Sequence, residues 1–446
     1  MAPIRSTDLV NRLTSQAADG LKKADANHSG VVTKAEEAAL PVALKEEVSK
    51  HRATVGTVKT EAFVSKFGAD VRAEVTRVDT NRDGMVSDAE QARLAPWLKD
   101  NVAALGTVAP GPTPVTARGA FGISGTVPSS RVELHTVLAS GLNKPLAVAQ
   151  NPHDKSIWIV NAGDDSSVVI DPQGQARLFH DDSAHFMNNP SAIAFSPTRN
   201  EFATVQDTDN DYNHHAMANM FMGPTVWTGD RTKFEGGTRS HLDMLHHSSN
   251  AMGIAAGADS TNREYWVFNG KAGSLDRYFF HQPHALGADD HSDGETIRYA
   301  EGQLKRVAGV PSHMALEAAS GKLFIADTGN GRVVALDTKR ASRQGTPIAG
   351  FHDETPLARG TAPALETITP AGALSRPAGL LLKDGNLIVG DNATGHIKVF
   401  SLTGELKGDL DTGLGPNALN GLAEVNGRLF ATDAKSNRLL EISVRV

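Results

Sequence analysis

The stretch PSHMALEAASGKLFIADTGNGRVVALD, residues 311–337, contains the pattern that decides the fold. An apolar segment is followed by a small-residue turn, then by the strand-like KLFIAD, a second turn and the strand-like RVVALD. Short apolar segments separated by Gly, Asn and Asp turns are typical of antiparallel β-sheets. The stretch therefore predicts consecutive strands of one small sheet.

The same pattern recurs along most of the chain. Each copy begins with an apolar opening, continues with a segment such as SIWIVNAG or NLIVGDNA, and often has a third such as HIKVFSLT. Repetition of a small sheet is typical of a β-propeller, in which each copy is one blade. The six openings are KPLAVAQ (144–150), NPSAIAF (189–195), NAMGIAA (250–256), PSHMALE (311–317), RPAGLLL (376–382) and LNGLAEV (419–425).

The two ends of this region predict how the ring closes. The last copy ends after its third strand at Val446, whereas the segment RVELHTVLA (131–139) precedes the first opening without a sheet of its own. This segment would complete the last blade and remove an open sheet edge. We therefore predict an all-β six-bladed propeller over residues 131–446.

One repeat resembles a known family. The segment IADTGNGRVVALD, with Asp327 and Arg332, resembles the NHL repeat, and TDAKSNRLLEIS retains the same pair as Asp433 and Arg438. In that family the aspartate and arginine bridge strand turns within a blade. The resemblance therefore implies a structural role for these side chains.

Among NHL propellers, the chain is similar to the lyase domain of peptide α-amidation, above all in VPSHMALEAASGKLFIADTGNGRV. This resemblance implies zinc-dependent cleavage of a peptidyl-α-hydroxyglycine. Blade-start histidines would hold the metal, and a tyrosine and an arginine would lie beside the substrate. Tyr278 and Arg277 are the candidates for these two roles.

The first hundred residues follow a different pattern. Apolar residues recur at helical spacing, and two acidic twelve-residue strings, DANHSGVVTKAE (25–36) and DTNRDGMVSDAE (79–90), interrupt them. Both strings match the EF-hand calcium loop, with Gly30 and Gly84 at the bend. The expected calcium ligands are Asp25, Asn27, Ser29, Val31, Thr33 and Glu36 in the first loop, and Asp79, Asn81, Asp83, Met85, Ser87 and Glu90 in the second.

These loops predict the organisation of the N-terminal part. Val31 and Met85 would bind calcium through their backbone carbonyls, and the first loop, which has fewer carboxylates, should bind more weakly. Val32 and Val86 stand where paired EF-hands form a short β contact. We therefore predict a multidomain chain, with an all-α EF-hand calcium-binding domain over 1–104, a Pro/Gly-rich linker over 105–130 and then the propeller.

A second metal site is predicted from histidines in the irregular blades. Long segments such as SHLDMLHHSSNAMGIA and HQPHALGADDHSDGETIRY contain many of the 17 histidines. Imidazole suits zinc and copper, and ligands at the starts of inner strands would converge at the channel mouth. The predicted ligands are His246 or His247 together with His291 and His313, and Asp293 is the candidate general base.

Composition excludes several classes of function. The net charge of −7 argues against a nucleic-acid surface, and no apolar run approaches the ~20 residues of a membrane span. The chain has no cysteine, which excludes disulfides and thiolate ligands.

Three hypotheses remain from the sequence. The first is a metal-dependent lyase or hydrolase acting on a small-molecule or peptide substrate. The second is a non-catalytic interaction propeller with a protein partner, and the third is a calcium-responsive structural protein. The calcium loops suit a secreted or periplasmic protein whose export signal has been removed; the other location that fits is the cytoplasm.

Overall fold

A computed structural model describes most of residues 120–444, with gaps at 124, 182–185, 210–221, 289 and 349–354. From the first hundred residues it describes 4–5, 13–14, 17, 21, 23–25, 27, 29, 31–40, 42–55, 58–78, 80, 85–86, 92–95 and 98. The chain divides into two compact units, Met1–Pro114 and Val115–Val446. None of the described helices is both long and apolar enough to cross a bilayer.

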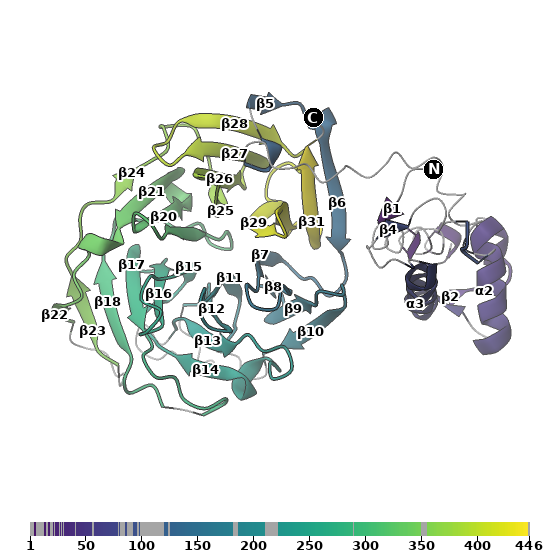
Figure 1. The fold of residues 1–446 in the computed structure, drawn as a ribbon, viewed down its shortest axis with the longest axis horizontal. Coiled ribbons are helices and arrows are strands. Elements are labelled where there is room, and N and C mark those ends of the chain that lie inside the picture. The colour runs from purple at the N-terminus through teal and green to yellow at the C-terminus, as the bar shows by residue number, and fades with distance from the viewer. Residues whose placement is uncertain are drawn as a thin grey trace. The chain divides into compact units, whose positions relative to one another are not determined.

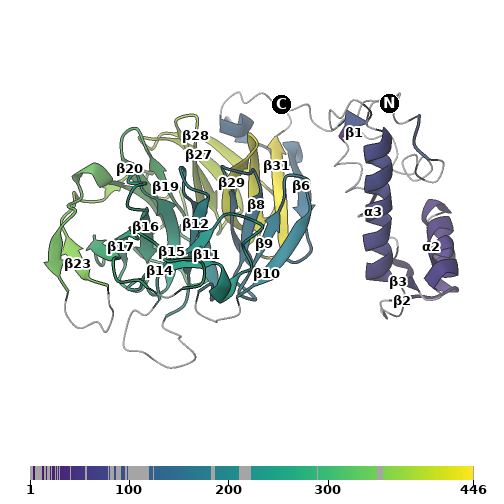
Figure 2. The same ribbon diagram turned by 60° about the horizontal axis from the view of Figure 1, so that its bottom comes forward.

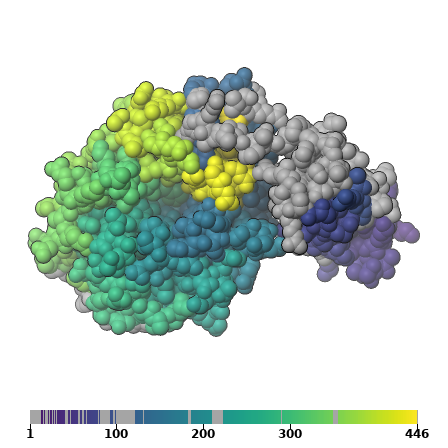
Figure 3. All heavy atoms as spheres, in the orientation of Figure 1, coloured from purple at the N-terminus to yellow at the C-terminus, as the bar shows by residue number. Residues whose placement is uncertain are grey.

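The second unit is a six-bladed β-propeller, which confirms the prediction (Figure 1). In the space-filling view the chain colours run around the ring from blue through green to yellow, so blade order follows sequence order (Figure 3). All six predicted openings form the inner strands. These are β7 (Pro145–Gln150), β11 (Pro190–Phe195), β15 (Ala251–Ala256), β19 (Met314–Glu317), β25 (Pro377–Lys383) and β29 (Leu419–Val425).

Each inner strand pairs antiparallel with a second strand, and this with a third. The second strands are β8 (Ile157–Asn161), β12 (Glu201–Gln206), β16 (Glu264–Asn269), β20 (Lys322–Asp327), β26 (Asn386–Asp391) and β30 (Arg428–Asp433). The third strands are β9 (Ser166–Ile170), β13 (Thr225–Thr228), β17 (Ser274–Phe279), β21 (Arg332–Asp337), β27 (His396–Ser401) and β31 (Arg438–Val444). The outer strands are β10 (Ala176–His180), β14 (His241–Met244), β18 (Glu295–Tyr299), β24 (Glu366–Thr367), β28 (Leu406–Asp411) and β6 (Val132–Leu138).

The ring closes as the sequence predicts. Strand β6 pairs antiparallel with β31, with Val132 opposite Val444, so that a segment preceding the first blade completes the last one (Figure 1). This pairing covers the edge that β31 would otherwise expose.

Small residues in the inner strands allow the blades to meet closely around the axis. A Cβ atom on Gly253 would lie 1.9 Å from the carbonyl oxygen of Ser312 in the next blade, and one on Gly379 would lie 2.3 Å from that of Asn420. No side chain fits at such a distance. Glycine at these positions therefore reflects packing between neighbouring blades.

Two blades carry additional strands. Strand β5 (Gly125–Val127) pairs parallel with β28, so the end of the predicted linker forms part of blade five. A hairpin of β22 (Gly345–Pro347) and β23 (Leu357–Gly360) pairs with β18 and lies at the outside of blade three in both ribbon views (Figure 1, Figure 2).

The aspartate–arginine pairs have the structural role that the resemblance implied. Asp327 lies 2.8 Å from Arg332 and Asp433 lies 2.6 Å from Arg438, in each case between the second and third strands of one blade. Both carboxylates are buried. They neutralise the guanidinium groups and hold the turns between the strands.

The first unit is not purely helical. Its helices α2 (Val42–Val55) and α3 (Thr60–Val78) pack around one apolar core, and its described residues also form four short strands. Strand β2 (Val31–Val32) pairs with β3 (Val58–Lys59), and β4 (Met85–Val86) pairs with β1 (Ile4–Arg5). The predicted contact between Val32 and Val86 is therefore wrong, because each of these strands has a different partner.

Candidate metal centre

The candidate site lies where a loop of blade three covers the outer edge of blade two. Strand β14 is the last strand of blade two, and the segment between β17 and β18 crosses to it. The backbone N–H of Gly287 donates to the carbonyl of His241 at 3.0 Å. Outer-edge N–H and C=O groups need such partners when they are covered. The sequence therefore places a histidine-bearing loop along this edge.

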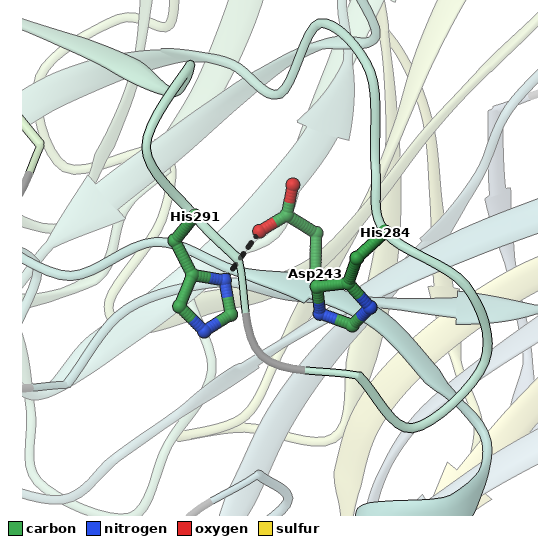
Figure 4. A group of neighbouring side chains, drawn as sticks. All are labelled: Asp243, His284 and His291. Carbon is green, nitrogen blue, oxygen red and sulfur yellow. Dashed lines mark hydrogen bonds and ion pairs between the residues drawn. The ribbon is translucent and has the colours of Figure 1, made fainter.

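Asp243, His284 and His291 converge at this edge (Figure 4). Asp243 lies on β14, and both histidines come from the loop between β17 and β18. Asp243 Oδ1 and His291 Nδ1 are 2.8 Å apart, and one ligand atom from each residue lies within 4.8 Å of the other two. Ligands on ~2.1 Å bonds around a tetrahedral metal lie about 3.4 Å apart, so a small movement of the loop would complete the geometry.

Two side-chain atoms of this group have no hydrogen-bond partner among the described residues. They are Asp243 Oδ2 and His284 Nε2, and both are buried. His284 Nδ1 lies 2.7 Å from the carbonyl oxygen of Ala285 and must carry the proton, because a carbonyl only accepts. In the neutral ring, Nε2 then has no proton and carries a lone pair. A buried polar atom without a partner costs about 1–3 kcal/mol, which a bound cation would relieve.

Electrostatics at Asp243 reflect the same arrangement. Burial raises the pKa of Asp243, and the hydrogen bond and charge of His291 offset this effect only in part. The side chain of Asp243 is fully buried, whereas that of His291 is 16% exposed. The group thus has one fully buried carboxylate beside two partly exposed histidines.

Two further histidines surround the group. The rings of His246 and His291 have centroids 6.4 Å apart, and those of His241 and His284 are 4.8 Å apart. His241 stacks on Phe186, with its Nδ1 2.8 Å from the carbonyl of Thr238. His241 is therefore held by the blade, whereas His246 lies beside the candidate ligands.

His247 and His313 have other surroundings. His247 has a φ of 86°, and its Nε2 lies 3.1 Å from the carbonyl of Thr355. Arg298 and Asn269 donate to the His247 carbonyl at 2.7 and 2.9 Å, so buried polar groups hold this strained backbone.

His313 directly precedes the inner strand β19 and contacts the inner strands of two other blades. Its backbone N–H donates to Ala378, and its Nε2 lies 3.3 Å from the Ser191 carbonyl on another inner strand. Burial lowers the pKa of His313 to about 4, so the ring is neutral near pH 7.

The structure does not assemble the predicted centre at the channel mouth. Among the described residues, the one group able to offer three metal ligands contains His291 but neither His313 nor His247. The physical reason is the position of the loop that carries His291. It connects the third and outer strands of its blade, and this connection lies at the rim rather than at the axis.

The other predicted site residues are fixed by structural contacts. Asp293 Oδ2 accepts the backbone N–H of Gln282 at 2.9 Å and so closes the loop that bears His284 and His291. Arg277 is buried, pairs with Glu264 at 2.8 Å and lies over the Trp266 ring.

Tyr278 is fully buried, and its hydroxyl donates to the carbonyl of His246 at 2.6 Å. This bond fixes the backbone next to the candidate ligands.

The sequence interpretation missed Asp243 and His284. Asp243 is the single charged residue of strand β14, HLDM, between apolar neighbours. A carboxylate at a buried strand position near several histidines was the available signal.

In the N-terminal unit, the first predicted calcium loop is largely described. The backbone N–H of Ser29 donates to Asp25 Oδ1 and to Asn27 Oδ1, each at 3.0 Å. Ser29 Oγ donates to the carbonyl of Val31 at 3.1 Å.

Thr33 and Glu36 form the other part of this loop, with the Thr33 hydroxyl 2.7 Å from the Glu36 carboxylate. Met85 is described only as part of β4. The remaining predicted ligands of the second loop, Asp79, Asn81, Asp83, Ser87 and Glu90, lie outside the described residues.

Comparisons with known proteins give weak resemblances. No family model matches the chain, and no curated protein matches it in sequence. A streptogramin B lyase is 10% identical, with a TM-score of 0.41 over 70% of this chain and 98% of that chain. An auxiliary nutrient binding protein from Bacteroides ovatus is 12% identical, with a TM-score of 0.45 over 71% and 77%.

A luciferin-regenerating enzyme is also 12% identical, with a TM-score of 0.44 over 70% of this chain and 95% of that chain. TM-scores below 0.5 identify no function. The propeller assignment rests on the strand topology itself.

Proposed function

We propose that the propeller holds one divalent transition metal, of the zinc or copper class, between Asp243, His284 and His291. The observation that carries the proposal is the convergence of these three side chains, whose ligand atoms lie within 4.8 Å of one another. The buried Nε2 of His284, which has no hydrogen-bond partner among the described residues, supports it. Two imidazoles and one carboxylate are ligands that such metals prefer. A cation would neutralise the buried carboxylate and use the lone pair of His284.

The best-supported activity is metal-dependent hydrolysis or lyase chemistry. Three protein ligands leave a coordination position for water, as in catalytic rather than structural zinc sites. A metal held there would lower the pKa of a water bound to it. The imidazole of His246, whose ring centroid lies 6.4 Å from that of His291, is the candidate group to exchange a proton with such a water. The Tyr278 hydroxyl fixes the backbone of His246.

A specific observation supports a second, non-catalytic role. The loop of blade three already bonds to β14 through Gly287 and His241. A metal between Asp243 and the two loop histidines would fasten the same loop more firmly. The propeller would then be an interaction platform with a metal-stabilised edge.

Metal analysis of variants tests the site. Protein purified without added metal is loaded with Zn²⁺, desalted and analysed by mass spectrometry. His284→Ala and Asp243→Asn should lose the transition metal that the unmodified chain retains. His396→Ala is the matched control, because His396 and Asp409 form a similar 2.7 Å pair on blade five. Equal zinc content in His284→Ala and the unmodified chain would refute the site.

Cobalt substitution separates the catalytic from the structural role. An open coordination position holds water, so the visible spectrum of the Co²⁺ protein should change with pH and on addition of azide. A closed structural site should show neither change. The experiment requires no knowledge of the substrate.

We also propose that the N-terminal unit binds calcium through the loops 25–36 and 79–90. Support comes from the ligand spacing of both strings and from the contacts among Asp25, Asn27 and Ser29 in the first. Glu36→Gln and Glu90→Gln should each remove one calcium ion in calorimetry, because each removes a carboxylate that binds through both oxygens.

A further inference from the structure

The short strands of the N-terminal unit repeat at a fixed interval. Strand β3 begins 54 residues after β1 (58 − 4), and β4 begins 54 residues after β2 (85 − 31). The strings 25–36 and 79–90 are separated by the same interval. Residues 4–50 and 58–104 therefore stand in the relation of two copies of one unit, which we call the first and second repeats.

The apolar core of the unit has the same interval. Equivalent positions of the two repeats are both apolar, and each side chain is at most 4% exposed. The buried equivalent pairs are Leu13 with Phe67, Ala17 with Val71, Leu21 with Val75, Ala24 with Val78, Leu40 with Leu94 and Leu44 with Leu98. Both repeats thus contribute the same positions to one shared core.

Thr14 and Gly68 show how the two repeats are related in space. They are equivalent positions at the same interval, and a Cβ atom on Gly68 would lie 3.1 Å from Thr14 Oγ1. A residue that contacts its own equivalent lies close to a two-fold axis, as in an isologous interface. The contact therefore places an internal two-fold axis close to Thr14 and Gly68.

The strand pairing crosses from one repeat to the other. Strand β2, in the first calcium loop, pairs with β3, which opens the second repeat; β4, in the second loop, pairs with β1, which opens the first. We propose that the N-terminal unit is a tandem duplication whose repeats exchange these strands, so that calcium in either loop stabilises the opening strand of the other repeat. The calcium part rests on the calcium binding proposed above.

The contacts around β2 provide a direct physical connection. Val32 and Val58 face each other in the pairing, and both are fully buried. Arg52 donates to the Val32 carbonyl at 2.5 Å and pairs with Glu37. Strand β3 continues without a break into α3, which ends next to Asp79 of the second loop. Ordering of the first calcium loop should therefore stabilise the start of α3, the helix that leads into the second loop.

Hydrogen exchange of the full chain, with and without calcium, tests the crossed coupling. Glu36→Gln should speed exchange at Val58–Lys59 about tenfold or more, because the opening of β2 releases β3. Glu90→Gln should do the same at Ile4–Arg5. Glu47→Gln, outside both loops, is the control of equal charge change. The proposal is overturned if each loop variant instead deprotects the opening strand of its own repeat.

Disulfide trapping tests the strand exchange without reference to calcium. The chain has no cysteine, so an introduced pair has no natural competitor. Val31 and Lys59 are directly opposite in the ladder, and such Cα atoms lie about 4.5–5.5 Å apart, within disulfide range. Val31→Cys with Lys59→Cys should cross-link under mild oxidation, whereas Lys59→Cys with Met85→Cys should not.

Together, the two experiments distinguish a failure of the strand exchange from a failure of the calcium coupling. Cross-linking of the Lys59–Met85 pair in place of the Val31–Lys59 pair overturns the strand exchange. The expected cross-link together with exchange rates that calcium leaves unchanged overturns the coupling and calcium binding, and the duplication alone would stand. Neither result bears on the metal centre of the propeller.

Discussion

Asp243 and Asp276 are both fully buried aspartates on neighbouring blades, yet their surroundings differ. Asp276 accepts hydrogen bonds from Arg298, Asn269 and Ser248 among its contacts. Burial acts to raise the pKa of Asp276, but the Arg298 guanidinium and these hydrogen bonds bring it below its ordinary value. The pKa of Asp243 is shifted in the opposite direction, and one of its oxygens has no partner among the described residues.

The different surroundings of the two aspartates distinguish a carboxylate that stabilises the fold from one that is a candidate metal ligand. A buried carboxylate surrounded by donors belongs to the fold, because its charge is already neutralised. A buried carboxylate with a raised pKa beside two imidazoles, as at Asp243, is the arrangement on which the proposed cation site rests. Hydrogen bonding to histidine does not by itself make the distinction, because the His396–Asp409 pair on blade five has a similar bond, while its second oxygen faces Lys398 at 3.6 Å.

The largest expected effect is the loss of stability caused by Asp276→Asn. Asp276→Asn removes the buried carboxylate that pairs with Arg298 at 2.8 Å and leaves this guanidinium with the more distant carboxylate of Glu301, at 3.9 Å. Breaking a buried pair in this way costs about 3–5 kcal/mol. Urea unfolding monitored by the fluorescence of the buried tryptophans measures the loss. Glu366→Gln, at the exposed pair with Lys322, is the control and should change little. A small loss in Asp276→Asn would mean that the donors around Asp276 do not make it a structural carboxylate.

His313 gives the next largest effect, through pH. Burial lowers its pKa to about 4, so below the ordinary histidine pKa of about 6.5 the unfolded chain binds a proton that the folded chain does not. Stability should therefore be lost as pH falls from about 6.5 to 4, by about 3 kcal/mol in total.

His313→Gln should flatten this part of the stability profile, measured by urea unfolding at several pH values. An unchanged slope would mean that His313 does not titrate as its burial requires. The control is His396→Gln, because His396 is partly exposed beside Asp409.

The sequence was sufficient for the propeller because its signal is local. Each blade opening, such as PSHMALE, contains the apolar pattern of one inner strand, and the closing strand before Pro145 was apparent from an incomplete last repeat. The end of the linker was misjudged because pairing of Gly125–Val127 with β28 depends on a partner almost 300 residues away (408 − 125).

The predicted metal ligands differ from the group that the structure brings together, for a related reason. His313 and His291 both stand in irregular segments, but only the path of the loop over β14 decides which residues meet. Sequence spacing contains no information on that path. The pairing of Val32 with Val58 and of Val86 with Ile4 was not predicted, because the position of a residue within a calcium loop does not specify its partner strand.

Metal binding at the proposed site gives the third expected effect, which requires Asp243 but not Asp409. Zn²⁺ at about one hundred times its Kd should stabilise the propeller by about 2.7 kcal/mol, because the ion binds only the folded state. Calorimetry with and without a zinc-selective chelator should show this shift in the unmodified chain and in Asp409→Asn, and none in Asp243→Asn. An equal shift in all three would place the metal elsewhere.

The smallest expected effect is that of Asp243→Asn without metal. Because burial raises the pKa of Asp243, the folded chain retains a proton that the unfolded chain releases as pH rises above the ordinary carboxyl pKa of about 3.9. This group therefore contributes less stability as pH rises through its raised pKa.

Asparagine keeps the shape of the side chain and removes its charge. At pH 7 in chelator, the free energy of unfolding of Asp243→Asn should therefore lie within about 1 kcal/mol of that of the unmodified chain or be slightly higher. Urea unfolding from pH 4 to 7 should also show that Asp243→Asn lacks the decrease in the free energy of unfolding that Asp243 causes as pH rises. A loss as large as that of Asp276→Asn would mean that Asp243 is a structural carboxylate whose partners are already in place.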